Sequence, residues 1–274
     1  MLGAMMPAAA LLAFLALQID PSKASETAAR AMLDAVPAKP PEPTDADKKC
    51  EPVKTGRELL DHREDGDSLD QAVRMLEFHA AKPDACLEIQ VLATEAYVRG
   101  LDRLQENKAQ EKATIRRYLA LGKPHGEASL KLAPNDGAAQ YWRACLLLHE
   151  ADWTQSLSKA NEALALLEKA EVSGPTVDDG GPSRMRGHVL AEMPLLFGGS
   201  LSTGVQHLKR SLEISPNNLT AHLWLGEAYA DQKKWGPARQ ELEGVVAAKP
   251  RPGHEKEDGA DQKAAAERIK KLKH

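Results

Sequence analysis

The stretch from Pro216 to Pro250, PNNLTAHLWLGEAYADQKKWGPARQELEGVVAAKP, decides the fold. The two prolines that bound it are 250 − 216 = 34 residues apart. Apolar residues recur in it at intervals of three and four, which indicates two amphipathic helices joined by a short turn. Proline lacks an N–H and restricts the residue before it, so the second helix is expected to end before Pro250. The stretch therefore predicts an antiparallel helix pair.

Small residues mark the expected crossing point of this pair. Gly226 on the first helix and Ala238 on the second are small where the two backbones must approach, and Tyr229 fills the space beside them. Together with Pro216 and Pro250, their spacing resembles the tetratricopeptide repeat, which has a period of 34 residues. The resemblance implies a stack of helix pairs that binds other molecules. An ordinary helical hairpin in a bundle is the alternative.

The composition agrees with a helical soluble domain. The 274 residues are 42% hydrophobic and 28% charged but only 4% aromatic, which favours helices over sheets. The net charge of −4 argues against a broad nucleic-acid-binding surface, so no nucleic-acid partner is expected. The predicted fold class is all-α, a solenoid of antiparallel helix pairs formed by degenerate repeats and closed by a C-terminal capping helix.

The N-terminal residues resemble an export signal. Residues 1–19 carry no charge, the apolar run 8–17 has the length of a signal-peptide core, and small residues precede a possible cleavage site after Ala24. No Lys or Arg precedes the apolar run. We expect export to the periplasm or cell envelope, while an uncleaved anchor and a buried helix stay open as alternatives. Contact with a membrane is expected only through this segment, if it is not cleaved.

Four segments are expected along the chain. They are a signal peptide or N-terminal anchor at 1–24, a Pro-rich linker at 25–55, the tetratricopeptide-repeat helical domain at 56–256 and a capping helix at 257–274. Helices are expected near 56–63, 68–82, 84–105, 111–132, 138–149, 153–171, 184–197, 201–214 and 261–272, besides the pair at 220–250. Gly122, Pro124 and Gly126 are expected to kink or break the fourth of these helices. Residues 173–182 are expected to form a long loop.

The three cysteines are too few for a disulfide framework. Cys86 and Cys145 lie in apolar helical contexts and are expected to be buried thiols. Cys50 lies in the Pro-rich linker and is expected to be exposed.

Three stretches of the chain resemble a more specific group. They are Leu195–Ser200 (LLFGGS), His207–Pro216 (HLKRSLEISP) and Gly226–Tyr229 (GEAY). These stretches are similar to the T component associated with TRAP (tripartite ATP-independent periplasmic) transporters, over about residues 138–272. The resemblance implies a periplasmic helical protein that binds the solute-binding component of an uptake system. It also implies that an apolar ligand could occupy a central pore.

The sequence lacks the common motifs of catalytic sites and of metal-binding sites. Nine histidines are scattered without zinc-ligand spacing, and no phosphate loop or nucleophile elbow is present. His149 and His188 are interpreted as surface or groove residues. The pair Asp178–Asp179 fails the EF-hand template, and Asn218, which fits a glycosylation sequon, is interpreted as a helix cap. We therefore expect no catalytic residue, no metal and no cofactor, and a protein that is not an enzyme.

The remaining candidate site is the concave surface, which the first helix of each pair lines in tetratricopeptide repeats. The residues expected to face it are Tyr141, Cys145, Arg186, Val189, Met193, Leu223 and Glu227. Packing between neighbouring repeats is the alternative for each of them, and Trp142, Trp224 and Trp235 are expected in the core. The predicted function is a non-catalytic scaffold that binds a protein partner, such as a periplasmic solute-binding protein. The alternative is a binder or carrier of a small apolar ligand.

Overall fold

The computed structural model describes residues 52–105 and 112–272. The expected signal segment, nearly all of the expected linker and Cys50 lie outside the described residues. The described residues all belong to one compact unit, Pro40–His274. Within these residues the chain is helical and contains no strand, as the predicted fold class requires.

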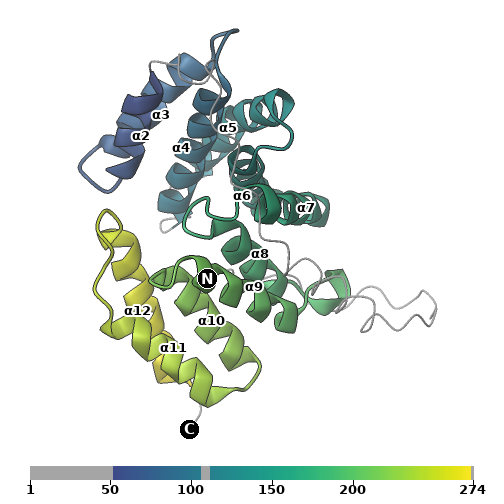
Figure 1. The fold of residues 1–274 in the computed structure, drawn as a ribbon, viewed down its shortest axis with the longest axis vertical. Helices are drawn as coiled ribbons and strands as arrows, with labels where there is room; N and C mark the ends of the chain where they lie inside the picture. Colours follow the sequence, from purple (N-terminus) through teal and green to yellow (C-terminus); the bar gives the residue numbers. More distant parts are fainter. Residues whose placement is uncertain (1–51, 106–111, 273–274) are drawn as a thin grey trace, which may run out of the picture. The chain divides into compact units, whose positions relative to one another are not determined.

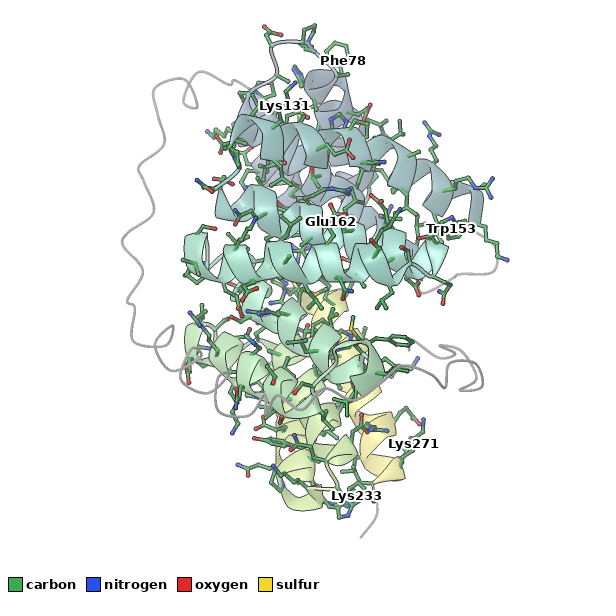
Figure 2. The ribbon with its side chains drawn as sticks, turned by 90° about the vertical axis from the view of Figure 1, so that its right-hand side faces the viewer. Phe78, Lys131, Trp153, Glu162, Lys233 and Lys271 are labelled. Atoms are coloured by element: carbon green, nitrogen blue, oxygen red, sulfur yellow. The ribbon has the colours of Figure 1, made fainter. Side chains whose placement is uncertain are left out.

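The helices follow one another as antiparallel pairs, and each pair packs on the next (Figure 1). The pairs are α2 (Pro52–Asp61) with α3 (Ser68–Ala80), α4 (Leu87–Gln105) with α5 (Lys112–Leu132), α6 (Gly137–Thr154) with α7 (Leu157–Ser173), α8 (Gly181–Glu192) with α9 (Leu201–Ile214), and α10 (Leu219–Asp231) with α11 (Trp235–Ala247). The last helix, α12 (Glu255–Lys271), packs on both α10 and α11. This arrangement confirms the predicted solenoid. In Figure 2 the pair that carries Phe78 lies at one end of the stack and Lys233 and Lys271 lie at the other.

The α10–α11 pair has the structure predicted for it. Ala238 is completely buried, and a Cβ atom on Gly226 would lie 2.8 Å from Cγ of Leu242, so the two helices do cross closely at small residues. The Asn218 side chain accepts a hydrogen bond from the backbone N–H of Ala221 at 3.0 Å, which confirms its role as a helix cap. The second helix ends at Ala247, shortly before Pro250.

Prolines precede several of the helix pairs, at unequal intervals along the sequence. Pro83, Pro134 and Pro216 lie just before α4, α6 and α10. Two whole pairs, α6–α7 and α8–α9, lie between Pro134 and Pro216. No proline stands in the turn before α8, but Pro182 lies inside the first turn of this helix. Proline suits that position because the first N–H groups of a helix have no helical partner.

Helix α5 has nearly the bounds expected for it and is not broken at Pro124, which lies inside the helix. The glycines on both sides of Pro124 allow close packing: a Cβ atom on Gly122 would lie 3.0 Å from Tyr97 Cβ, and one on Gly126 would lie 2.7 Å from Arg143 Cδ. The expected end of helix α8 was wrong. Helix α8 ends at Glu192 instead of Phe197 because Pro194 follows closely.

Three further helix boundaries differ from the expectation. Helix α2 starts at Pro52, inside the expected linker, and α12 starts at Glu255 rather than at 257 or 261. Trp153 lies at the end of α6 instead of opening the next helix.

Apolar side chains form three clusters along the stack. One joins α2, α3 and α4, the second joins α4 to α7, and the third joins α9 to α12. Trp142 is buried in the second cluster, and Trp224 and Trp235 are partly buried against the third. Among the described helices, none is both long and apolar enough to cross a membrane.

The two cysteines among the described residues differ in their bonding state. The expectation of a free thiol at Cys86 was wrong, because Cys86 is disulfide-bonded and only partly buried. Cys145 is a free, buried cysteine, as expected. Burial raises the pKa of the Cys145 thiol, which keeps it in the unreactive neutral form.

Candidate functional site

The loop between α7 and α8, residues 174–180, lies on the first helices of three successive pairs. We call it the interior loop. At its centre, Asp178 accepts hydrogen bonds from Tyr141 Oη at 2.5 Å, from Arg184 Nη2 at 2.5 Å and from Arg99 Nη2. These donors come from α6, α8 and α4, and the Asp178 side chain is only 10% exposed. One carboxylate therefore joins three repeats.

The backbone of the interior loop adopts an uncommon conformation to reach this position. Asp178, Asp179 and Gly180 have consecutive positive φ angles of 50°, 54° and 78°. Aspartate tolerates this left-handed region better than most residues. Gly180 is required sterically as well, since a Cβ atom there would lie 2.9 Å from Ser211 Oγ. Arg184 Nη1 also donates to the backbone oxygen of Asp178 at 2.9 Å, which holds the turn in place.

The charges around Asp178 are strongly coupled. Burial alone would raise the pKa of Asp178, but Arg99 and Arg184 outweigh burial and hold it well below its usual range. Burial and the nearby Asp178 carboxylate raise the pKa of Tyr141, so its hydroxyl stays a hydrogen-bond donor. Arg99 also lies over the ring of Trp142, at 4.9 Å from the ring centroid. The two arginines thus favour the ionised form of Asp178, which acts as a structural anion.

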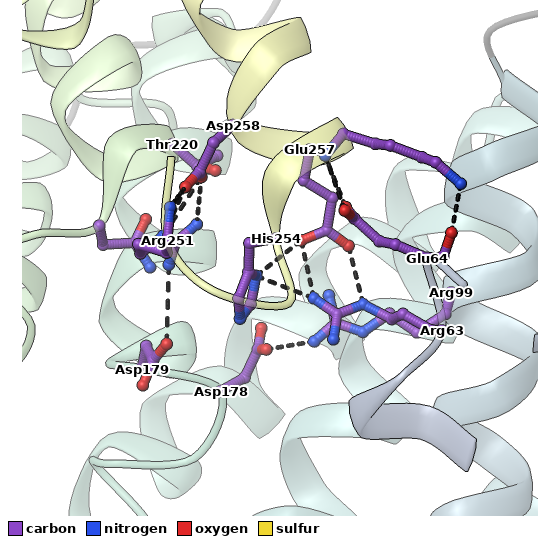
Figure 3. Close-up of polar contacts among 12 residues, drawn as sticks. Arg63, Glu64, Arg99, Asp178, Asp179, Thr220, Arg251, His254, Glu257 and Asp258 are labelled. Atoms are coloured by element: carbon purple, nitrogen blue, oxygen red, sulfur yellow. Dashed lines mark hydrogen bonds and ion pairs between the residues drawn. The ribbon is translucent and has the colours of Figure 1, made fainter. Parts of the chain in front are cut away.

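The contacts of Asp178 continue into a second branch, which starts at the next residue, Asp179 (Figure 3). We call the contacts of Asp178 and Asp179 the interior network. Asp179 Oδ2 lies 3.6 Å from Arg251 Nη1. Arg251 Nη2 and Nε also donate to the fully buried Asp258 of α12, at 2.7 Å to Oδ1 and 3.1 Å to Oδ2. The interior loop is therefore connected to the C-terminal end of the stack as well as to its middle.

A third group of contacts joins the two ends of the stack (Figure 3). Arg63 and Glu64, in the loop between α2 and α3, contact the segment His254–Glu257 at the start of α12. We call this group the terminal clasp. It lies beside the interior network, so charged and hydrogen-bonded residues line the inner side of the stack.

Most of the residues predicted to face a concave groove are engaged in packing or pairing. Tyr141, Cys145 and Leu223 are buried, and Tyr141 is covered by the interior loop. Val189, Met193 and Glu227 are partly exposed. The structure therefore places these six on or just after α6, α8 and α10, but three of them do not reach the surface. A groove for a partner at this position stays a prediction.

Arg186, the seventh predicted residue, belongs to another buried cluster. It donates to Glu171 Oε2 at 2.6 Å, while Ser183 Oγ and His207 Nδ1 lie 2.9 and 2.7 Å from Glu171 Oε1. Burial would raise the pKa of Glu171, but His207 and Arg186 outweigh it and lower the pKa to about 2. This cluster joins α7 to α8 and α9 and is structural.

Sequence reasoning missed the residues at the centre of the network. Arg99, Arg184 and Arg251 belong to no motif, and the only motif tested for Asp178 and Asp179 is the EF-hand template, which they fail. The long loop predicted at 173–182 is present between α7 and α8. The signal that could have pointed to its buried turn is the Asp-Asp-Gly-Gly stretch, which favours left-handed backbone. No group of His, Cys, Asp and Glu among residues 52–105 and 112–272 has the geometry of a metal site.

A different kind of surface lies between α8 and α9. Leu195, Leu196 and Phe197, which form a single 3-10 turn, are 84%, 79% and 40% exposed. We call these three residues the apolar turn. The sequence from Met193 to Gln206 contains no charged residue, although 28% of the chain is charged. Consecutive exposed apolar side chains of this kind mark interaction sites more often than isolated ones do.

Comparison with known families identifies the C-terminal part of the stack. Residues 199–254, which include α9, α10 and α11, match the family described as tetratricopeptide repeat. A comparison with curated proteins gave no match. The family match and the consecutive helix pairs together support a tetratricopeptide repeat protein.

Proposed function

We propose that this protein is a non-catalytic, exported scaffold that binds a protein partner through the apolar turn. The observation that carries the proposal is the exposure of Leu195 and Leu196 in an uncharged part of a tetratricopeptide-repeat stack. Repeats of this class commonly mediate contacts between proteins. Leaving two adjacent leucines in water is unfavourable, and a partner that covers them would recover about 1.5–3 kcal/mol for each side chain.

The partner proposed is an envelope protein, specifically the solute-binding component of a TRAP-type uptake system. Two features support this choice. The apolar turn lies within Leu195–Ser200, one of the stretches that resemble the T component of such systems. The inner side of the stack is occupied by the interior loop, so the outer turn is the better candidate for contact with a folded protein.

Export is supported by the apolar N-terminal sequence and by the disulfide at Cys86. Disulfides persist mainly in oxidising compartments such as the bacterial periplasm. The expected product of cleavage after Ala24 starts at Ser25. N-terminal sequencing of the protein recovered from an envelope fraction tests this, and a chain that keeps residues 1–24 in a cytosolic fraction would contradict it.

A small apolar ligand, the alternative function, has less support than a protein partner. The inner side of the stack is lined by ion pairs such as Arg184–Asp178 and Arg63–Glu257. A cavity of about 340 Å³ between α3, α4 and α5 has a polar side formed by Glu77, Gln90 and His125. The ion-paired inner side lacks the apolar lining that such ligands need, whereas the cavity combines this polar side with an apolar side formed by Ala80, Ala81, Leu121, Pro124 and Ala128.

The binding proposal is tested by affinity capture from an envelope fraction. The double variant Leu195→Asp/Leu196→Asp should lose the captured partner, because it places two charges in the proposed interface. Phe78→Asp is the matched control, since Phe78 is also 66% exposed but lies in α3. Equal capture by the wild type and the double variant would overturn the proposal. Capture of a solute-binding protein encoded beside this chain would identify the partner.

A further inference from the structure

Contacts in a repeat stack normally join only neighbouring repeats. The terminal clasp departs from this rule, because it joins residues about 190 positions apart at the two ends of the stack. Arg63 Nε and Nη2 donate to the two carboxylate oxygens of Glu257 at 2.9 and 2.8 Å. Arg63 Nη2 also lies 2.9 Å from His254 Nδ1. The Arg63 side chain is only 9% exposed, so the pair is partly protected from water.

The second half of the clasp is a helix cap supplied from a distant element. Helix α12 has His254 at its N-cap, and this side chain makes no capping hydrogen bond. Glu64 supplies the missing acceptors, because its two carboxylate oxygens accept hydrogen bonds from the backbone N–H groups of Lys256 at 2.6 Å and Glu257 at 2.8 Å. A carboxylate at a helix N-terminus is also favoured by the helix dipole.

The clasp is polar, and the apolar cores on its two sides are separate. Helices α2 and α3 belong to the cluster that contains Leu60 and Leu76. Helix α12 belongs to the cluster that contains Leu242 and Ala265. No buried apolar cluster among the described residues contains side chains from both ends. Breaking the clasp would therefore expose charged groups to water without opening either core.

We propose that the terminal clasp is a latch that closes the stack over the interior network and opens without unfolding the helix pairs. In the closed state, Arg63 and Glu257 lie beside Arg99 and Asp178 (Figure 3). In the open state, the ends separate and the start of α12 loses its cap, while α10 and α11 stay packed. The latch does not depend on which partner binds the apolar turn.

Hydrogen exchange of the full chain, measured by mass spectrometry, tests the latch. Glu64→Gln removes the charge and leaves one good acceptor for the two N–H groups. We expect exchange in the peptide covering 254–260 to rise at least tenfold, with no change in α10 and α11. Glu58→Gln is the matched control, because Glu58 is exposed on α2 and pairs with Lys54 of the same helix at 3.8 Å. It should behave as the wild type.

Arg63→Ala provides a second variant with an independent measurement. It should increase the radius of gyration in small-angle X-ray scattering and accelerate exchange in 254–260 to a similar extent. Unchanged exchange at 254–260 in both variants would overturn the proposal. Equal acceleration in α10 and α11 would overturn it as well, since the clasp would then be part of the global fold instead of a latch.

Discussion

The interior loop and the apolar turn flank the same helix, α8, but differ in burial and in polarity. Asp178 in the interior loop is buried and accepts hydrogen bonds from three helices, whereas Leu195 in the apolar turn is 84% exposed. The loop carries charged groups of the kind often found in a binding site, but the hydrogen bonds of its central carboxylate are made within the chain. The apolar turn is therefore open to a partner, whereas the polar groups of the interior loop are already paired within the chain.

The largest expected effect comes from breaking the interior network. Asp178→Ala leaves Arg99 and Arg184 without their shared anion, which should reduce the free energy of unfolding by about 3–5 kcal/mol. Chemical denaturation measures this loss. Asp179→Ala is the matched control, because Asp179 has the same type of backbone conformation but a side chain that is 55% exposed, and it should cost under about 1 kcal/mol. Equal losses in both variants would show that the loop backbone, and not the ion pairs, carries the stability.

A smaller effect is expected from acid, through Glu171. Its pKa is lowered to about 2 in the folded state from an ordinary value of 4.5, so the stabilisation is complete above about pH 4.5. The stabilisation should be lost as the pH falls from about 4.5 to about 2, to the extent of about 3 kcal/mol. Denaturation curves across this range measure it. In Glu171→Gln this part of the pH dependence should disappear; a wild-type profile in that variant would assign the acid sensitivity to other carboxylates.

The smallest effect on stability is expected at the apolar turn. Leu195→Asp/Leu196→Asp should change the free energy of unfolding by less than about 0.5 kcal/mol, because both side chains are already exposed. Thermal unfolding of the isolated protein measures this. A clear loss of stability would mean that the leucines pack within the chain, and the contrast with the interior loop would fail.

The repeat could be predicted from sequence where local spacing determines it. Gly226, Ala238 and the flanking prolines located the α10–α11 pair, and Asn218 was recognised as a cap. The end of α8 near Pro194 was predicted wrongly, and the sequence left open whether Pro124 would kink or break α5, because both outcomes depend on tertiary packing.

The site was harder to predict than the fold, because its contacts are long-range. Tyr141 was expected to face a groove, but its partner Asp178 was not foreseen. Arg99 and Asp178 are 79 positions apart, and Arg63 and Glu257 are 194 apart. Such pairs depend on how the stack curves, which the spacing within one repeat does not determine.

Photo-crosslinking in cells at the apolar turn tests whether a protein partner contacts it. A photoreactive phenylalanine analogue replaces Leu196 in one variant and Phe78 in another, and crosslinked products are identified by mass spectrometry. We expect a discrete adduct with one envelope protein from position 196 and none with that protein from position 78. The absence of a protein adduct at position 196, or the same adducts from both positions, would contradict it.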